Sequence, residues 1–150
     1  VEACSILKRR GYRFNWYVLG NGVEEDNIKK MIKGCGVQDC FHLLGIRVNP
    51  YPYIDQCDIY VQPSKHEGYG IAVAEARMLN KPIVCTDFTG ARDQIVNGQT
   101  GSIVGFQATE IADAIEYLFK HKEVQTMFCR NLSNSEKCCE KELDQIVRYF

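Results

Sequence analysis

The sequence predicts an α/β protein built on a parallel sheet with helices on both faces. Two observations carry this prediction. Short apolar segments rich in β-branched residues alternate with longer segments of helical periodicity along most of the chain. Some short segments, such as residues 82–86, are almost entirely apolar, as expected for strands buried on both faces. The 150 residues suffice for a sizeable core, so we expect a single domain over residues 1–150.

The first half of the chain contains helix and strand signals in alternation. Ala3, Ile6 and Leu7 have helical spacing, and the segment at residues 23–33 places acidic residues before lysines, as the helix dipole favours. Residues 13–19 are rich in aromatic and branched side chains. We expect helices at residues 2–10, 23–33 and 51–56, and strands at residues 13–19, 41–44 and 58–62.

The second half continues this alternation and then becomes helical. We expect strands at residues 82–86 and 102–104, and helices at residues 70–79, 91–96, 109–121, 124–131 and 137–150. The small polar cluster Ser133-Asn134-Ser135 predicts a break between the last two helices.

The stretch from Val61 to Glu75 contains the strongest functional signal. It predicts a strand end, a turn, a Gly-Tyr-Gly loop and a helix start, with Glu67 and Glu75 flanking the start of the helix. In a parallel sheet, the carboxyl end of a strand that leads into a helix N-terminus is where anionic ligands bind. Gly68 and Gly70 would let the backbone N–H groups approach such a ligand closely. The plainer interpretation is a strand–turn–helix whose acids only complement the helix dipole.

Glu75 is expected to face the sheet, which would bury its carboxylate. Its neighbours three and four residues away on the helix are all apolar: Ile71, Ala72, Met78 and Leu79. A buried carboxylate needs a polar partner. The candidates are two sugar hydroxyls of a ligand, or the guanidinium of Arg77 or Arg92.

Composition excludes several classes of partner and site. A formal net charge of −1 gives no general attraction to nucleic acid or to anionic membranes, and no apolar run approaches membrane-spanning length. The eight cysteines form no C-x-x-C pair, so zinc spacing is absent and no metal is expected. We interpret them as reduced thiols of a cytoplasmic protein. The chain does not begin with Met, and we expect it to be a piece of a longer protein.

A nicotinamide dinucleotide site is a weaker interpretation of the sequence. Gly20-Asn21-Gly22 follows a strand and precedes a helix, as the dinucleotide fingerprint requires. Glu25, however, occupies the third glycine position, and acidic residues crowd the helix start that would hold the pyrophosphate. The sequence therefore argues against this cofactor.

The combined motifs resemble those of retaining glycosyltransferases of family 4. Their E-x7-E signature is matched by Pro63-Ser64, Glu67-Gly68-Tyr69-Gly70 and Glu75-Ala76. The match extends in the family's order to residues 81–87, Gly90, residues 95–98 and Thr100-Gly101, and upstream to Gly20, Gly22 and residues 41–45. The resemblance covers roughly residues 2–119. It implies the C-terminal, donor-binding half of a GT-B enzyme. This half would be a doubly wound, Rossmann-like domain that binds a nucleotide-diphospho-sugar and needs no metal or other cofactor.

The resemblance also implies roles for individual residues. Glu75 would hold the ribose hydroxyls of the nucleotide, and Glu67 would contact the transferred sugar as the catalytic residue. The diphosphate and sugar would face the backbone N–H groups around four residues: Gly68, Tyr69, Gly70 and Ile71. Ile46 and Arg47, after the strand at residues 41–44, are candidate contacts to the base.

The chain also departs from the family pattern. The family's C-terminal half opens with a strand that carries an Arg, followed by a Lys, both on the phosphates; Arg9 and Arg10 lie too late to replace them. The N-terminal acceptor-binding domain is also missing. We therefore expect no transferase activity from this chain alone. Loss of the central first strand should leave residues 13–19 and 58–62 with unpaired edges, which either close up directly or cause self-association.

The resemblance as a whole predicts a domain of a metal-independent enzyme that transfers a sugar to an acceptor hydroxyl with retention, in glycan or polysaccharide biosynthesis. Such an enzyme would be cytoplasmic or peripheral at the inner membrane face. Two alternatives stay open at this point. One is a non-catalytic nucleotide-binding or interaction module of Rossmann type; the other is a dehydrogenase domain, which would need nicotinamide binding near Gly20.

Overall fold

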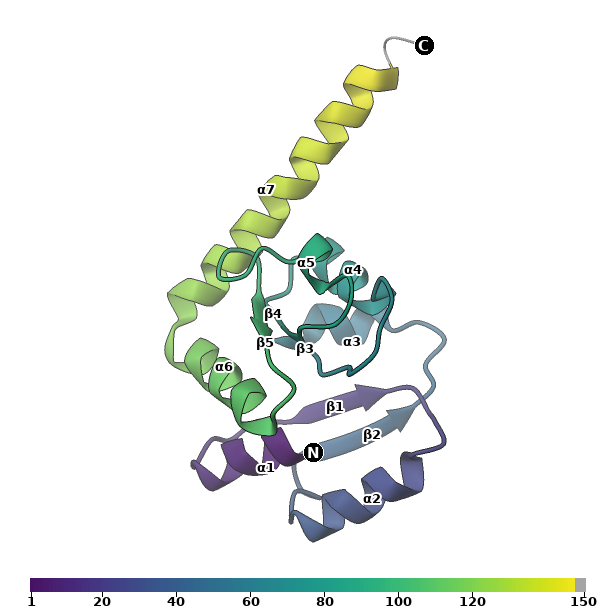
Figure 1. Ribbon diagram of the computed structural model, residues 1–150, viewed down its shortest axis with the longest axis vertical. Coiled ribbons are helices and arrows are strands. Elements are labelled where there is room, and N and C mark those ends of the chain that lie inside the picture. The colour runs from purple at the N-terminus through teal and green to yellow at the C-terminus, as the bar shows by residue number, and fades with distance from the viewer. Residues whose placement is uncertain (148–150) are drawn as a thin grey trace.

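The protein has an α/β architecture in which short strands alternate with helices (Figure 1). This computed structural model describes the backbone of residues 1–147 and the side chains of residues 1–135. The helices are α1 (Glu2–Arg9), α2 (Glu25–Gly34), α3 (Tyr51–Gln56), α4 (Ile71–Met78), α5 (Ala91–Gln94), α6 (Ala108–Lys120) and α7 (Lys122–Val147). The strands are β1 (Trp16–Leu19), β2 (Phe41–Gly45), β3 (Tyr60–Gln62), β4 (Ile83–Thr86) and β5 (Ser102–Val104).

All strand pairs are parallel, and they form two groups. β1 pairs with β2, with Trp16 opposite Phe41, whereas β4 lies between β3 and β5, with Val84 opposite Val61 and Ser102. Among the described residues, β1 and β3 share no ladder with each other, so each is the edge of its group. This is the arrangement expected of a doubly wound sheet whose central first strand is absent.

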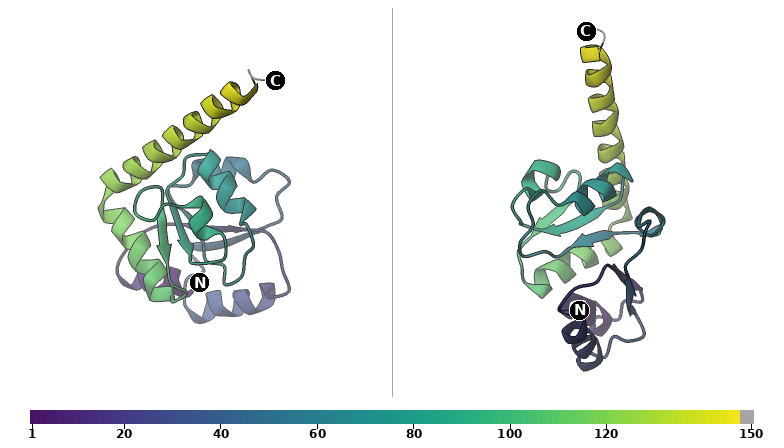
Figure 2. Two further views of the ribbon diagram at one scale, coloured as in Figure 1. Left: turned by 45° about the horizontal axis from the view of Figure 1, so that its top comes forward. Right: turned by 90° about the vertical axis from the view of Figure 1, so that its right-hand side faces the viewer.

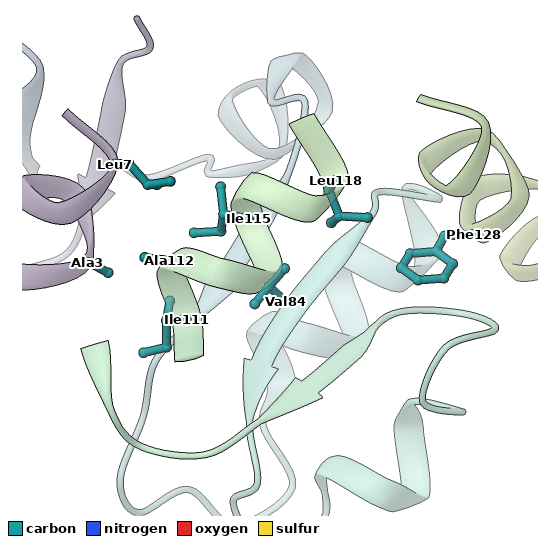
Figure 3. Packing of buried hydrophobic residues seen from close by; sticks show 8 residues of the cluster. All are labelled: Ala3, Leu7, Val84, Ile111, Ala112, Ile115, Leu118 and Phe128. Atoms are coloured by element: carbon teal, nitrogen blue, oxygen red, sulfur yellow. The ribbon is translucent and has the colours of Figure 1, made fainter. Parts of the chain in front are cut away.

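One face of the strands is covered by α1 and α6, which pack on each other. Their contact forms a core of fully or nearly buried apolar side chains, which Figure 3 shows in close-up: Ala3, Leu7, Val84, Ile111, Ala112, Ile115, Leu118 and Phe128. Because the cluster joins α1 of the first strand group to β4 of the second, side-chain packing links the two groups.

The opposite face of the second group is covered by α3, α4 and α5. Ile54, Val73, Ala76 and Ala91 from these helices pack on Ile83 and Cys85 of β4. Since side chains alternate between the two faces of a strand, Val84 points into the first cluster and its neighbours point into the second. All four residues of β4 are buried, which confirms the predicted strand with helices on both faces.

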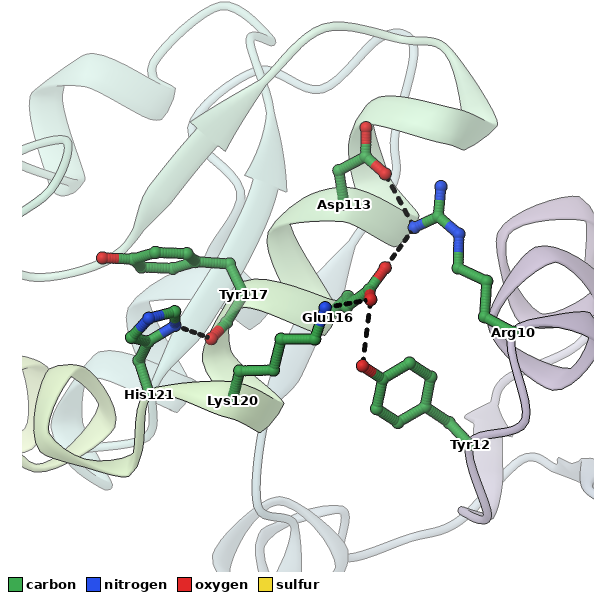
Figure 4. Close-up of polar contacts among 7 residues, drawn as sticks. All are labelled: Arg10, Tyr12, Asp113, Glu116, Tyr117, Lys120 and His121. Carbon is green, nitrogen blue, oxygen red and sulfur yellow. Dashed lines mark hydrogen bonds and ion pairs between the residues drawn. The ribbon is translucent and has the colours of Figure 1, made fainter.

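A polar network also links the segment before β1, in the first strand group (β1 and β2), to α6 (Figure 4). The hydroxyl of Tyr12 donates to Glu116 Oε1 at 2.9 Å, and Lys120 donates to the same carboxylate. Arg10 bridges Glu116 and Asp113, lying 2.7 Å from Asp113 Oδ1. Hydrogen bonds from Lys120, Tyr12 and Arg10 lower the pKa of Glu116 to about 2.

Two predictions about element boundaries are wrong. The expected strand at residues 13–19 is shorter, beginning at Trp16, and the two expected C-terminal helices form one helix, α7. The predicted break at Ser133–Ser135 does not occur, because the burial of Phe128 and Leu132 stabilises the helix that leads into this segment. The Ser135 hydroxyl donates to the Leu132 carbonyl at 2.7 Å within the helix. Beyond the residues that pack on the domain, α7 extends away from the strands (Figures 1 and 2). Residues 148–150 of the predicted last helix lie outside the described part.

Candidate functional site

The loop from Pro63 to Gly70 connects the carboxyl end of β3 to the start of α4. Gly70 is the N-cap of α4 and adopts a left-handed conformation, with φ 76° and ψ 61°, which explains the glycine. α4 has no side-chain cap at this end. Within the described residues, the backbone N–H groups of Gly70 and Ile71 are paired with no acceptor. These N–H groups are the free donors that a helix N-terminus offers to an anion.

The loop rests directly on the segment between β4 and α5. A Cβ atom on Gly90 would lie 2.7 Å from the Gly68 carbonyl oxygen, and one on Gly70 would lie 2.9 Å from the Phe88 ring. Both glycines have positive φ as well. The loop backbone therefore lies close against its support, with no room for a side chain at Gly70 or at Gly90.

Hydrogen bonds at the end of β4 fix the beginning of the loop. Thr86 is buried, and its hydroxyl lies 3.2 Å from the Gln62 carbonyl oxygen and 2.5 Å from that of Ser64. The Gln62 amide in turn donates to the Ser64 hydroxyl at 2.8 Å and accepts from Tyr60 at 2.8 Å. Pro63-Ser64 and Thr86, both part of the sequence motif, thus hold the strand ends together.

Glu75 is not buried against the sheet, so this prediction is wrong. The apolar residues expected around it, Ile71 and Met78, are 71% and 69% exposed, and α4 buries Val73 and Ala76 instead. The helix is therefore rotated so that Glu75 is half-buried at the boundary.

The polar partner of Glu75 is Tyr51, at the first position of α3. The Tyr51 hydroxyl donates to Glu75 Oε1 at 3.2 Å, and this hydrogen bond raises the pKa of Tyr51. Neither predicted guanidinium has this role: Arg92 pairs with Asp87, and the Arg77 Nε is buried with no partner among the described residues.

Glu67 lies half-buried in the loop. Burial, followed by the negative charges of Glu75, Cys57 and Glu67, raises the pKa of Tyr60. The structure thus brings the two glutamates of the motif to the same end of β3.

Ile46 and Arg47 follow β2 and lie in an exposed loop that leads into α3. Ile46 is 66% exposed, and the Arg47 guanidinium carbon lies 6.0 Å from the centre of the Tyr53 ring. Because α3 carries both Tyr53 and Tyr51, this loop is connected through one short helix to Glu75. The predicted base contacts and the predicted ribose contact therefore lie on neighbouring elements.

Two residues of this region escaped the sequence interpretation. Tyr51 gave no signal, because a tyrosine after a proline is common on surfaces. The sequence signal for Gln94 was weak. Gln94 is a polar residue at helical spacing with Ala91 and next to Ile95, and all three side chains are buried. Its side-chain amide donates to the carbonyl oxygens of Tyr69 and Gly70.

A cavity of about 290 Å³ lies between the two strand groups and reaches Pro63 and Lys65, at the start of the loop that carries Glu67. Its lining includes Ala3, Trp16, Pro63 and Ile111.

Among the described side chains, no group of three or more His, Cys, Asp or Glu residues could hold a metal ion. None of the described helices has the length and apolar character needed to cross a membrane. Arg10 pairs with Asp113 and Glu116 of α6.

Comparison with known proteins agrees with the motif. A family model described as Glycosyl transferases group 1 matches residues 1–134. The chain is 29% identical over 134 residues to the alpha-D-kanosaminyltransferase of Streptomyces kanamyceticus, covering 87% of this chain and 35% of that protein. It is 28% identical over 139 residues to the capsular polysaccharide biosynthesis glycosyltransferase CapM of Staphylococcus aureus, again covering 87% of this chain and 35% of the relative. The chain thus spans 35% of the length of these two relatives.

Solved structures show the same fold at low sequence identity. HepE of Anabaena, solved in complex with UDP, superimposes with a TM-score of 0.79 at 17% identity, covering 99% of this chain and 44% of HepE. This likeness confirms the Rossmann-like fold with parallel strands and helices on both faces. The match of the family model over residues 1–134 settles the assignment: the chain belongs to the glycosyl transferases group 1 family.

Proposed function

We propose that this chain is the donor-binding domain of a glycosyltransferase that uses a nucleotide-diphospho-sugar. The observation that carries the proposal is the loop Glu67–Gly70 with the uncapped start of α4. It places two carboxylates and free backbone N–H groups at the carboxyl end of β3. Carboxylates suit the hydroxyls of sugars, and the N–H groups of a helix N-terminus suit a diphosphate.

Each predicted residue has a role in this proposal. Glu75 holds the ribose hydroxyls, with Tyr51 orienting its carboxylate, and Glu67 contacts the sugar that is transferred. The N–H groups at Gly68, Tyr69, Gly70 and Ile71 face the diphosphate, while Ile46 and Arg47 lie toward the base. The UDP complex of HepE supports UDP as the first nucleotide to test.

The reaction proposed for the whole enzyme is transfer to an acceptor hydroxyl with retention at the anomeric carbon. The departing diphosphate would assist the acceptor hydroxyl on the same face of the sugar, without a metal or other cofactor. The names of the relatives support a role in glycan or polysaccharide biosynthesis. The six cysteines whose side chains the structure describes are free, which supports a cytoplasmic protein. The whole enzyme would be cytoplasmic or peripheral at the inner membrane face.

A separate acceptor-binding domain completes the enzyme in this proposal. The support is that the chain spans 35% of the length of two relatives that are named as transferases. We propose further that the open edges of β1 and β3 pair with another strand. In this chain alone, that pairing would occur as self-association.

The test separates the two glutamates in the full-length enzyme. Glu75→Ala should weaken binding of the nucleoside diphosphate by about 1.5–3 kcal/mol, the range for a hydrogen bond to a charged group. Glu67→Ala should leave that affinity nearly unchanged and lower kcat for the nucleotide-sugar, because the sugar contact strengthens in the transition state. Titration calorimetry with UDP, GDP and ADP, together with initial rates, measures both effects.

Glu123→Ala, at an exposed position at the start of α7, is the matched control and should change neither quantity. If the glutamates had a purely structural use, both substitutions would lower the melting temperature and leave the affinity alone. An unchanged diphosphate affinity of the Glu75→Ala variant would rule out the ribose assignment.

A further inference from the structure

Gln94, at the end of the short helix α5, is buried although most of α5 lies near the surface. The side chain is 4% exposed, between the buried residues Ala91 and Ile95. Burial of an amide is unfavourable unless the amide is hydrogen-bonded. The contacts of this side chain therefore need an explanation.

The Gln94 amide nitrogen donates to two successive backbone carbonyls of the glycine-rich loop. One acceptor is the Tyr69 oxygen, and the other is the Gly70 oxygen at 3.3 Å. The Gln94 side-chain oxygen is buried and has no partner among the described residues. The amide is thus held for its donor function, while its acceptor oxygen stays unsatisfied.

The contact with Tyr69 also sets the direction of one N–H group. In a planar trans peptide, the carbonyl and the N–H of one unit point in opposite directions. The Tyr69 carbonyl shares its plane with the Gly70 N–H, so the Gly70 N–H points away from Gln94. The Gly70 carbonyl also accepts from the N–H groups of Val73 and Ala74, so α4 itself sets the direction of the Ile71 N–H.

The same N–H groups are the unpaired donors at the start of α4. α4 has no side-chain cap, so no hydroxyl or carboxylate of the described chain competes for them there. The close approach of Gly90 to the Gly68 carbonyl and of Gly70 to Phe88 holds the loop against the same support. Shape and hydrogen bonds therefore fix one orientation of the loop.

We infer that Gln94 is a positioning residue for donor binding, which turns the Gly70 N–H group toward the diphosphate, beside the Ile71 N–H at the start of α4. The inference rests on the proposed function, since it assumes that this loop binds a nucleoside diphosphate. Gln94 itself lies beneath the loop and contacts only protein.

Gln94→Met in the full-length protein tests this inference, because Met keeps the length of the side chain and removes the donor. Binding of the tightest of UDP, GDP and ADP should weaken about tenfold or more, equivalent to losing about one hydrogen bond to a charged group. Binding of the matching nucleoside, which has no phosphate, should stay within about twofold of wild type, well below that loss. A merely structural role of Gln94 would not separate the two ligands.

Gln125→Met is the matched control within the same chain. Gln125 is also buried, at 8% exposure, and donates to a backbone carbonyl, that of Leu118 at 2.6 Å, on the α6–α7 side. It should lower the melting temperature comparably and leave both ligand affinities unchanged. If Gln94→Met does not fold, Gln94→Asn serves instead, because it keeps a buried amide while its shorter side chain withdraws the donor from the loop carbonyls.

The possible outcomes test this inference separately from the proposed function on which it rests. Wild-type protein that binds a nucleoside diphosphate, with Gln94 variants that bind it equally well, would overturn the positioning role alone. Wild-type protein that binds none of the three nucleoside diphosphates would overturn the proposed function and this inference together.

Discussion

The β1–β2 pair and the β3–β4–β5 group are built from the same strand–helix units, but they differ in burial. β4 has a strand on each side and helices on both faces, and all four of its residues are buried. β1 has one neighbouring strand, and its residues are half-buried or exposed, Tyr17 being 55% exposed. The two groups share no described ladder, so they are joined by α1 on α6 and by the network at Glu116. Their attachment therefore depends on side chains, whereas within each group it depends on backbone hydrogen bonds.

The two groups also contribute differently to the site. The loop with both glutamates, its support at Gly90–Gln94 and the hydroxyl of Thr86 all belong to the second group. The first group contributes the loop at Ile46 and Arg47, which reaches the second group through α3 and the contact of Tyr51 with Glu75. A change in how the groups are joined should therefore affect the base and ribose end of the site more than the diphosphate end.

Leu7→Ala should have the largest effect, because Leu7 is fully buried between the two groups. We expect a loss of about 2–5 kcal/mol in the free energy of unfolding, as for other buried Leu→Ala changes. The amide hydrogens of β1 should also exchange with solvent at a lower free energy of opening than those of β4. The reason is that the contact between α1 and α6, which joins the two groups, opens first. Urea unfolding and native-state hydrogen exchange measure the two effects.

Ile83→Ala is the control for that prediction, because Ile83 is equally buried but packs within the second group. It should cost a similar free energy and lower the protection of β4 itself. If β1 and β4 exchange with the same free energy in the wild type and in the Leu7→Ala variant, the two groups form one cooperative unit and the comparison fails.

The open edge of β1 should be the site of self-association, and Tyr17→Pro should reduce it. Trp16 N–H donates to the carbonyl of Cys40, the residue just before β2, at 2.7 Å, so the N–H of the next residue, Tyr17, points to the open side. Proline there removes a donor to an added strand without removing a β1–β2 bond. Sedimentation velocity over a range of concentrations should show the wild type growing in mass and the variant staying monomeric.

Val18→Pro provides the contrast, because Val18 lies opposite Leu43 with its N–H directed to β2. It should destabilise the β1–β2 pair itself, in addition to any effect on association. A wild type that stays monomeric at all concentrations would remove the basis for the edge proposal.

Glu116→Gln should have the smallest effect, and one that depends on pH. The pKa of Glu116 is lowered from 4.5 to about 2, so the ionised carboxylate stabilises the folded state above pH 4.5, and this contribution is lost as the pH falls towards 2. The melting temperature of the wild type should therefore exceed that of the variant at neutral pH, with the two converging near pH 2. Glu123→Gln should leave the melting temperature unchanged at every pH. A difference in melting temperature between the wild type and Glu116→Gln that stays constant from neutral pH to about pH 2 would contradict the prediction.

Much of the fold could be predicted from residue periodicity, and the part that failed was local. The alternation of apolar segments predicted every described strand and the order of the helices, with differences of a few residues at their ends. The break at Ser133–Ser135 was predicted wrongly, because small polar residues can bond within a helix when a neighbour such as Leu132 anchors it by burial. Propensity is a weak signal where packing favours the opposite result.

The residues of the candidate site also divide into those that the sequence predicted and those that it did not. Glu67, Gly70 and Glu75 could be found from the sequence, because their spacing and their place between a strand and a helix are local properties of the chain. The partners Tyr51 and Gln94 could not, since each reaches its target across more than 20 residues of sequence, with separations of 24 and 25. The rotation of α4, which exposes Ile71 and leaves Glu75 half-buried, also depends on which residues of other helices meet it.

The sequence by itself therefore determined the strand–helix alternation, the position of the glycine-rich loop and the pair of glutamates. These depend on periodicity, on glycine's access to positive φ and on spacing along one segment. The tertiary structure alone decided that the strands form two groups joined through α1 and α6, and that Gln94 supports the loop from below. These features arise from contacts between distant segments, whose burial and geometry are set only when the helices pack against the strands.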